Sequence, residues 1–437
     1  MSEIYYLFLN LFGLISADVR AIFLFLPLFL MFEVPLIILT VIGILKWYWS
    51  NQPTELEHLP SISFIITCYS EGPSILQTID TLVEQVYSAE IEILVVIDGA
   101  VQNKETYAAA MQAYHLYRNT PFRTVRVIPK WQRGGRVSTL NAGLSKANNE
   151  IVINVDGDTS FDNDVAWNMA KRFANSDVLA SGGALRVRNW DTNLITRMQS
   201  LEYMMSMQAG KTGTSELGLL NNISGAFGAF RKTILKRVGG WDTHTAEDLD
   251  LTMRLKQYKR RYPHMKLAFT PHAVGHTDVP DTLKGYISQR LRWDGDLFFL
   301  YLRKHIKGLN PSLLGWPTFI YTFVYGVLQN VLIPLLVVLF TIYLFVVYPL
   351  KVAVVVILLL YCLYFTVVVI KFLIYLLLVS ERKNADLRML LWLFIYPFYA
   401  FLSRIVTAFA VSNEVLRRSH EESNMAPWWV IKKGKKF

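Results

Sequence analysis

The sequence predicts an α/β domain with a mainly parallel sheet, inserted between transmembrane α-helices. Of the 437 residues, 53% are hydrophobic and only 18% are charged, whereas soluble domains carry about 25% charged residues. The apolar excess lies in two blocks, one near each end of the sequence. Between the blocks, short β-rich runs alternate with segments of helical periodicity, which is typical of a parallel sheet covered by helices.

The apolar blocks are long enough to cross a bilayer, which takes about 20 apolar residues in a helix. The first residues lack a basic cluster and a small-residue cleavage site, so a signal peptide is a poor interpretation of them. We expect spans at 22–46, 327–348, 352–379 and 389–411, and a shorter interfacial or partial span at 4–15. The chain then divides into N-terminal membrane segments (1–50), a soluble domain (51–307), interfacial and transmembrane helices (308–413), and a basic tail (414–437).

Basic residues flank the predicted spans, among them Lys46, Arg303 and Arg382. By the positive-inside rule, the soluble domain faces the cytoplasm and the protein is a multi-pass protein of the cell membrane. Three spans after the soluble domain would put the lysine-rich segment 432–436 outside. Either 313–348 contains an extra crossing or a re-entrant segment, or the last span does not cross.

The formal net charge of +10 would also suit a nucleic-acid partner. The basic residues, however, cluster at predicted membrane edges, where they face anionic headgroups, and no RNA-binding motif accompanies them. We therefore expect a lipid bilayer and no nucleic acid as partners. Within the spans, Lys371 and Arg404 are functional candidates because intramembrane charge is costly, although snorkelling is the simpler interpretation for Lys371.

Acidic residues follow three of the four strands that the sequence predicts in the soluble domain. The predicted strands are 62–67, 91–97, 125–128 and 151–155, and the predicted helices include 75–86 and 137–147. Ligands of parallel α/β sheets collect at the carboxyl ends of the strands. The acids at these ends are Glu71, Asp98, Asp156 and Asp158.

Asp156 and Asp158 stand one residue apart at the end of a buried strand. Two hard carboxylate oxygens directed to one side suit Mg²⁺ or Mn²⁺ shared with a diphosphate. An acidic turn is the alternative, since Asp and Gly are common turn formers. The acids at the neighbouring strand ends favour the metal site.

Two further motifs carry potential chemistry. Glu247 and Asp248 precede a predicted helix at 249–257, where they could merely cap the helix dipole or supply a catalytic base. Gln289, Arg292 and Trp293 fall at i, i+3 and i+4 on one helical face. An amide, a guanidinium and an indole on one face can grip a pyrophosphate and stack on a sugar, or can anchor an interfacial helix.

These motifs, in this order before a membrane bundle, resemble those of membrane-embedded family 2 glycosyltransferases of the processive polysaccharide synthase type. Cellulose, chitin, hyaluronan and poly-N-acetylglucosamine synthases belong to this type, and the resemblance covers roughly 61–293 and the flanking membrane helices. It implies a GT-A type nucleotide-sugar domain, a UDP-sugar donor, Mg²⁺ or Mn²⁺, and a growing polysaccharide as acceptor. It also implies extrusion of the product between the membrane helices, with an accessory membrane or export subunit as a candidate partner.

On the donor side, the resemblance implies contacts to the nucleotide and its metal. Tyr69 and Glu71 would lie against the uridine, and Asp98 would contact the uracil or ribose. Asp158, with Asp156 beside it, would hold the cation on the diphosphate. Arg136 takes the place of the usual lysine in a GGK-type segment, which keeps the charge and alters its geometry.

On the acceptor side, Asp248 would be the general base, with Glu247 beside it. Arg292, with Gln289 on the same face, would stabilise the departing UDP, and Trp293 would stack at the acceptor end. Ser224 and Gly225 would line the acceptor terminus. Aromatic residues that could line a polymer route are Trp316, Tyr321, Tyr325 and Tyr396. For any single one of them, an interfacial belt or a packed helix contact is the favoured interpretation.

The sequence also departs from the family pattern. Ser70 stands where Asn is usual and Ala246 where Thr is usual, and we find no FxVTxK-like gating loop and no cyclic-dinucleotide-binding domain. These departures count against a cellulose synthase with that regulation, and the segment 281–286 looks more like poly-N-acetylglucosamine synthases. Two other classes stay open: a transferase that adds one sugar to a membrane lipid, and a transport or scaffold protein with a degenerate domain.

Overall fold

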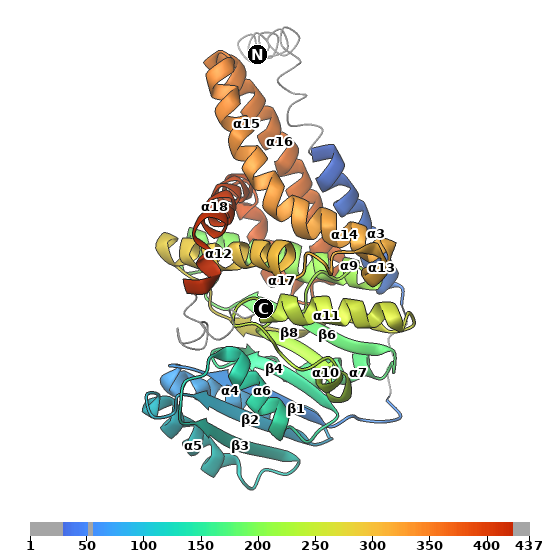
Figure 1. The fold of residues 1–437 in the computed structure, drawn as a ribbon, viewed down its shortest axis with the longest axis vertical. Coiled ribbons are helices and arrows are strands. Elements are labelled where there is room, and N and C mark those ends of the chain that lie inside the picture. Colours follow the sequence, from blue (N-terminus) through green and yellow to red (C-terminus); the bar gives the residue numbers. More distant parts are fainter. Residues whose placement is uncertain (1–28, 51–55, 423–437) are drawn as a thin grey trace.

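The computed structural model of the chain describes residues 29–50 and 56–422. The expectations for 4–15, for the start of the first span and for 432–436 lie outside these residues. The described part contains an α/β domain at one end and long apolar helices at the other, with short helices between them (Figure 1).

The α/β domain is built on an eight-stranded sheet in the order β3-β2-β1-β4-β7-β6-β8-β5. Its first half is parallel and confirms the four strands expected from the sequence. These strands are β1 (Ile62–Cys68), β2 (Ile91–Asp98), β3 (Arg123–Lys130) and β4 (Ile151–Asp156). Their carboxyl ends therefore lie at one edge of the sheet, as the sequence predicts.

The second half of the sheet is mixed. Strand β7 is antiparallel to both β4 and β6, β6 and β8 run parallel, and β5 pairs antiparallel with β8. These strands are β5 (Ser160–Phe161), β6 (Val178–Val187), β7 (Phe227–Arg231) and β8 (Lys266–Thr277). The fold is a mixed, mostly parallel α/β sheet of the GT-A-like kind.

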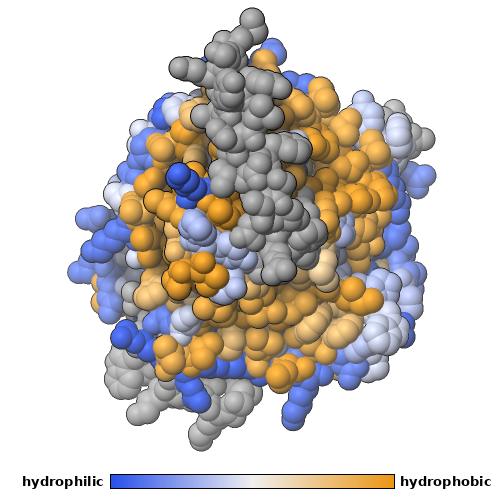
Figure 2. Space-filling model, turned by 90° about the horizontal axis from the view of Figure 1, so that it is seen from above, coloured by the Kyte–Doolittle hydropathy of each residue, from blue (hydrophilic) through white to orange (hydrophobic). Residues whose placement is uncertain are grey.

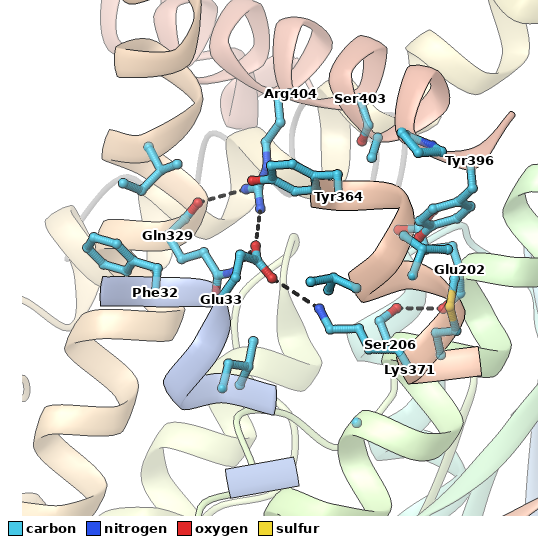
Figure 3. A pocket seen from close by; sticks show the side chains of 18 of the residues that line it. Phe32, Glu33, Glu202, Ser206, Gln329, Tyr364, Lys371, Tyr396, Ser403 and Arg404 are labelled. Carbon is cyan, nitrogen blue, oxygen red and sulfur yellow. Dashed lines mark hydrogen bonds and ion pairs between the residues drawn. The ribbon is translucent and has the colours of Figure 1, made fainter. Parts of the chain in front are cut away.

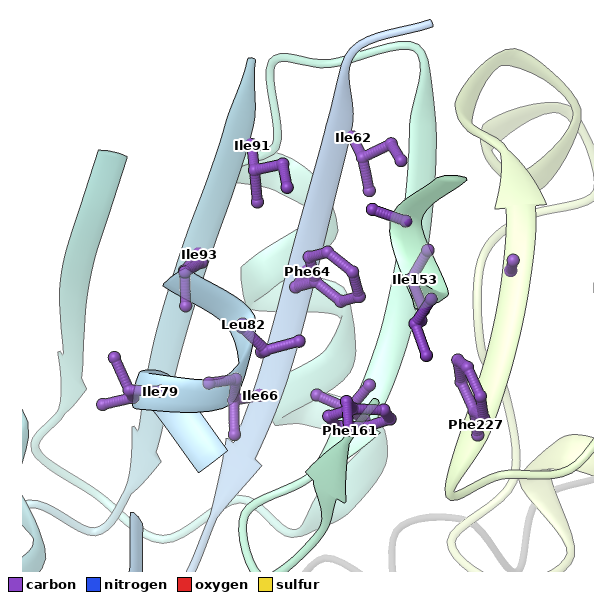
Figure 4. Close-up of a cluster of buried hydrophobic side chains, with 14 of the residues drawn as sticks. Ile62, Phe64, Ile66, Ile79, Leu82, Ile91, Ile93, Ile153, Phe161 and Phe227 are labelled. Carbon is purple, nitrogen blue, oxygen red and sulfur yellow. The ribbon is translucent and has the colours of Figure 1, made fainter. Parts of the chain in front are cut away.

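Helices cover both faces of the sheet, which explains why every residue of β1 and β2 is buried. Phe64 and Ile66 point towards one face, where α4 (Ile75–Val83), α5 (Lys104–Tyr117) and α7 (Val165–Phe173) pack (Figure 4). Ile65 points to the other face. That face is covered by α6 (Arg136–Lys146), α10 (Lys232–Arg237) and α11 (Glu247–Arg261). Two apolar layers thus hold the edge that carries the acidic residues in place.

Short helices lie between the sheet and the apolar helices (Figure 1). Two of them, α9 and α12, contact the membrane-type helices α3 and α18 directly. The connecting helices are α8 (Leu194–Glu202), η3 (Tyr203–Gly210), α9 (Lys211–Glu216), α12 (Leu283–Phe299), η4 (Leu300–Lys304) and α13 (Pro311–Leu314). Single-turn elements η2 (Gly72–Ser74) and η8 (Ser419–Glu422) complete the domain and the end of the described chain.

Three helical stretches in the described residues are long and apolar enough to span a membrane: Leu30–Tyr48, Trp316–Val347 and Leu350–Val379. A further pair, Lys383–Trp392 and Tyr396–Arg417, passes the same test together but is bent by 77°. The stretches contain η1 (Phe29–Glu33), α3 (Val34–Tyr48), α14 (Trp316–Tyr321), η5 (Thr322–Leu332), α15 (Ile333–Val347), α16 (Leu350–Ile374), η6 (Tyr375–Val379), α17 (Lys383–Asp386), η7 (Leu387–Trp392) and α18 (Tyr396–Arg417).

Three of the expected spans overlap single apolar stretches among the described residues, and two differences stand out. The second helix starts at Trp316, eleven positions before the expected 327, and the fourth expected span is the bent pair. Apolar side chains gather over the end of the molecule that these helices form (Figure 2). Such a surface suits contact with lipid.

The first apolar helix is joined to the α/β domain by a close backbone contact. A Cβ added to Gly43 of α3 would lie 1.8 Å from the carbonyl oxygen of Gly213 in α9. A Cβ on Gly213 would lie 2.3 Å from the carbonyl oxygen of Thr40. Because both positions lack a side chain, the two helix backbones can approach each other closely.

We expect Gly43→Ala to force α3 away from α9 and to lower the free energy of unfolding by about 1–3 kcal/mol, the usual cost of overpacking. Thermal unfolding in detergent measures the change. Gly210→Ala is the matched control, because the nearest atom to a Cβ there is the Met205 carbonyl oxygen at 3.5 Å. Equal midpoints for the two variants would contradict the close contact.

Candidate active site

Arg136 joins three parts of the chain at the carboxyl edge of the sheet. Its Nε donates to Glu247 Oε1 at 2.6 Å, and its Nη2 donates to the Gly225 carbonyl oxygen at 2.6 Å. Its Nη1 forms an ion pair with Asp156 Oδ1 at 2.5 Å. Burial alone would lower the pKa of Arg136, but the two carboxylates outweigh burial and raise it. The guanidinium is thus held in its charged form.

Asp248 is bound differently from its neighbour Glu247. Its Oδ2 accepts from the Gly225 amide at 3.1 Å and from Asn222 Nδ2 at 3.3 Å, and its Oδ1 accepts from the Leu249 amide at 2.8 Å. Burial, followed by the charge of Glu247, raises its pKa to about 6. No ion pair to Asp248 is present among the described residues. A carboxylate with a pKa near neutrality and no cation bound to it can accept a proton.

Asp98 has both carboxylate oxygens occupied by its own chain. Oδ1 accepts from Lys130 Nζ at 2.6 Å and from the Gly134 amide at 2.8 Å, and Oδ2 accepts from the Gly135 amide at 2.8 Å. The side chain is buried. Asp98 therefore fixes the loop that leads into Arg136, and the expected contact to a uracil or ribose stays a prediction.

Glu71 and Asp158 lie at the ends of β1 and β4. A Cβ added to Gly157 would lie 2.9 Å from Glu71 Cγ, so the Glu71 side chain packs directly on the acidic turn. Burial raises the pKa of Asp158, and the charge of Asp156 raises it further. Burial also raises the pKa of Glu71, with smaller contributions from Asp158 and Asp156. The carboxylates repel one another, so a nearby positive charge would stabilise their ionised forms.

Tyr69, expected to lie against uridine, is exposed at the same edge. The Arg133 guanidinium lies over its ring, 4.0 Å from the centroid. The adjacent Ser70 has a φ of 72°, a left-handed conformation that is costly for residues other than glycine. This turn therefore presents the flat face of the Tyr69 ring. A nucleobase could stack on this ring beside the Arg133 guanidinium or in its place.

Helix α12 carries the three residues expected to grip a pyrophosphate and a sugar. Arg292 is exposed, whereas Trp293 is half-buried against the apolar layer that contains Phe64. Gln289 Oε1 is buried without a hydrogen-bond partner among the described residues. Ser224 and Gly225 precede β7, and Gly225 contacts both Arg136 and Asp248.

Sequence reasoning missed a link between α12 and the acidic pair. Thr245 Oγ1 donates to Asp296 Oδ2, and both side chains are buried. Burial raises the pKa of Asp296 to about 7. Between this link and Glu247 lies Ala246, whose φ of 51° is left-handed. The only signal in the sequence is that Asp296 stands four positions after Arg292, on the same helical face.

A cavity of about 810 Å³ extends from this region between the apolar helices (Figure 3). Asn222, which donates to Asp248, and Lys211 line one part of it. Most of its remaining lining is apolar and comes from α3, α15, α16 and α18. Of the aromatic residues expected along a polymer route, those that line the cavity are Tyr321, Tyr325 and Tyr396, whereas Trp316 is exposed.

A GT-A-like sheet covered by helices on both faces, with acids at its strand ends and with Gln289, Arg292 and Trp293 on one helix, is typical of a nucleotide-sugar transferase. The model of the family described as "Glycosyltransferase like family 2" matches residues 60–295, more than half of the chain. The chain belongs to this family and is a glycosyltransferase.

Two relatives carry the same name in different species. The chain is 30% identical over 242 residues to the poly-beta-1,6-N-acetyl-D-glucosamine synthase of Staphylococcus epidermidis, covering 55% of this chain and 55% of that protein. It is 27% identical over 263 residues to the synthase of Staphylococcus aureus strain COL, covering 58% and 60%. The similarity thus spans little more than half the length of these relatives and supports a polysaccharide synthase at the level of the family.

A solved structure resembles the fold over most of its length. The mannosyltransferase PcManGT from Pyrobaculum calidifontis, solved with GDP-Man and Mn²⁺, matches with a TM-score of 0.52 and 18% identity. The match covers 91% of this chain and 97% of that chain. At this identity the likeness concerns the fold alone.

We expect Arg136→Met to lower the free energy of unfolding by about 3–5 kcal/mol, because it leaves buried carboxylates without their cation. Arg136→Lys keeps the charge but cannot reach Asp156, Glu247 and Gly225 together, so its loss of stability is smaller and its loss of activity remains large. Thermal unfolding and initial rates, measured on the same preparations, separate the two effects. A fully active Arg136→Met variant would contradict the bridging role.

Proposed function

We propose that the protein is an inverting β-glycosyltransferase that adds sugars from a UDP-sugar to the end of a growing polysaccharide. UDP-N-acetylglucosamine and UDP-glucose are the proposed donors. The observation that carries the proposal is the cavity that starts beside Asn222, the hydrogen-bond donor to Asp248. A product formed at Asp248 could enter this cavity without crossing lipid.

Asp248 is the proposed general base. The acceptor hydroxyl attacks C1 of the α-linked donor in line, the bond from C1 to the diphosphate breaks, and the hydroxyl proton passes to Asp248. One displacement inverts the configuration and gives a β bond. Glu247 cannot share this work in the same way, because its Oε1 is held by Arg136 at 2.6 Å. We assign Glu247 to positioning Arg136 and Gly225 around the base.

Asp158 is the proposed main ligand of a divalent cation, Mg²⁺ or Mn²⁺, with Asp156 beside it. The described residues contain no group of three or more His, Cys, Asp and Glu side chains that could hold a metal alone. Such a cation commonly binds one or two carboxylates and completes its shell with water and substrate phosphates. When bound, it would neutralise charge on the leaving diphosphate. Asp156 also forms an ion pair with Arg136, so its carboxylate would serve both the cation and the guanidinium.

The remaining site residues are assigned to the two substrates. Arg292 stabilises the departing UDP, Gln289 supports the same helical face, and Trp293 stacks against the acceptor sugar. The nucleotide lies near Tyr69, Glu71 and Asp98, and Ser224 lies at the acceptor terminus. We place the transferase domain on the cytoplasmic side of the cell membrane, where an accessory membrane or export subunit is a candidate partner.

A second function is favoured by one observation, the mainly apolar lining of the cavity. A polysaccharide needs polar partners along its path, whereas a lipid chain is stabilised by apolar walls. The second candidate is therefore the transfer of one sugar to a membrane lipid whose chain lies in the cavity.

The size of the product distinguishes the two functions. The purified protein is incubated with radiolabelled UDP-N-acetylglucosamine or UDP-glucose and with Mg²⁺ or Mn²⁺. We expect a labelled product that is excluded from a gel-filtration matrix, whereas a single glycolipid would be retained. Asp248→Asn should lower the rate by about 10²–10⁴, the usual contribution of a general base. A labelled single-sugar glycolipid would overturn the polymer, and full turnover by Asp248→Asn would overturn the base.

The rate should fall as the pH is lowered through about 6, because Asp248 must be deprotonated to act as a base and its pKa is raised to about 6. Lys211 lowers the pKa of Asp248 through its positive charge. Lys211→Met should therefore move the acidic limb of the pH–rate profile to higher pH. Initial rates at saturating donor, measured across pH for both proteins, test this shift. An acidic limb that stays at the same pH or moves to lower pH in Lys211→Met would contradict it.

A further inference from the structure

A cluster of charges lies in the cavity at the level of the apolar helices (Figure 3). Glu33 Oε2 accepts from Lys371 Nζ at 3.0 Å, and Glu33 Oε1 lies 3.8 Å from Arg404 Nη2. Arg404 Nη1 also donates to the Gln329 carbonyl oxygen at 2.8 Å, and Gln329 Nε2 donates to Glu33 Oε1 at 3.3 Å. The four residues come from four separate helical stretches. They meet inside the bundle, so their contacts are not those of a surface ion pair.

The cluster has two cations and one carboxylate. The side chains of Lys371 and Arg404 keep exposed fractions of 31% and 27%, while that of Glu33 keeps only 11%. The carboxylate is therefore largely used by its present partners, and the two cations retain surface towards the cavity. A guanidinium has five N–H donors, more than the two acceptors described here can engage.

Two of the other charged residues of the cavity wall pair with each other, since Arg290 Nη2 donates to Glu202 Oε2 at 2.5 Å. Asp294 Oδ2 accepts from Thr407 Oγ1 at 2.7 Å and lies within electrostatic reach of Arg404. Lys211 lies within electrostatic reach of Asp248. Lys371 and Arg404 thus share Glu33 as their ion-pair partner among the described residues.

The cluster lies well inside the apolar stretch. Lys371 precedes Val379, the last residue of its stretch, by eight positions, or about 12 Å at 1.5 Å per residue. An ionisable residue in such surroundings is rare and marks a functional site by default. An anion entering the cavity would gain charge-assisted hydrogen bonds that the protein alone does not satisfy.

We propose that this cluster binds the phosphate group of an anionic membrane lipid, whose hydrocarbon chains lie along the apolar cavity wall. The lining around the cluster includes Leu36, Ile37, Val337 and Val368, from three of the helices that would face lipid. Charge complementarity selects the headgroup and the apolar wall selects the chains. The inference deepens the second candidate function and rests on it, because both place a lipid chain in this cavity.

Native mass spectrometry of the purified full chain tests the site without any sugar donor. The probes are dioleoylphosphatidylglycerol and dioleoylphosphatidylcholine, which share their chains and differ in net charge. We expect at least tenfold tighter binding of the phosphatidylglycerol. Inorganic phosphate should not displace it, because free phosphate lacks the chains. Equal binding of the two lipids, or displacement by millimolar phosphate, would overturn the proposal.

Substitutions in the cluster should change the affinity for phosphatidylglycerol in opposite directions. Lys371→Gln and Arg404→Gln should each weaken phosphatidylglycerol binding about tenfold, whereas Glu33→Gln should strengthen it by removing the competing carboxylate. Lys351→Gln is the matched control, since Lys351 is an exposed cation at the start of α16 and does not line the cavity. A drop of the same size in Lys351→Gln would indicate lipid bound at the outer surface and would overturn the site.

Folding of each variant is checked by its thermal midpoint. Where a cation variant does not fold, the comparison of the two lipids on the unchanged protein and the sign of the Glu33→Gln effect decide the question. Failure here leaves the product-size experiment unaffected, because lipid binding and sugar transfer are measured separately.

Discussion

The guanidinium of Arg136 is the interaction on which the arrangement of the site depends. It is buried between Asp156 at the end of β4, Glu247 at the start of α11 and the carbonyl oxygen of Gly225 before β7. These segments are remote in sequence, and no other described side chain contacts all three. Asp98 supports the same contact indirectly, because it fixes the glycine amides that lead into α6. As a result, Glu247 is paired with Arg136, whereas Asp248 has no ion-pair partner among the described residues.

The interface between the α/β domain and the apolar helices is held by a buried ion pair, by a hydrogen bond and by a close approach of two helix backbones. Arg186 pairs with Asp386, and Tyr375 Oη donates to the same carboxylate at 2.7 Å. Gly43 and Gly213 bring two helix backbones together on another side. Asp248 is linked to the cavity through Asn222, which donates to its carboxylate and lines the cavity wall.

The sequence was sufficient for the parallel half of the sheet, because buried β-rich runs and helical periodicity are local signals. It also located the acids at the strand ends and the pair at 247–248. It could not show that Arg136 bridges Asp156 and Glu247, because pairing across distant segments leaves no periodic pattern. Snorkelling is the wrong interpretation of Lys371, whose ammonium pairs with Glu33 inside the bundle. The antiparallel strands and the contact of Asp296 were missed because they too depend on pairing between distant segments, which leaves no periodic pattern in the sequence.

The pairing of Glu33 with Lys371, separated by 338 positions in the chain, has a consequence for the order of assembly. During synthesis the helix that carries Glu33 is made long before its cationic partners exist. The insertion of a charged side chain in a lone membrane helix is costly, about 2.5–3.5 kcal/mol at the helix centre. The stretch that carries Glu33 is therefore incompletely stabilised until the helices that carry Lys371 and Arg404 have been made. A chain truncated before these helices would leave the stretch Leu30–Tyr48 without the ion-pair partners of Glu33.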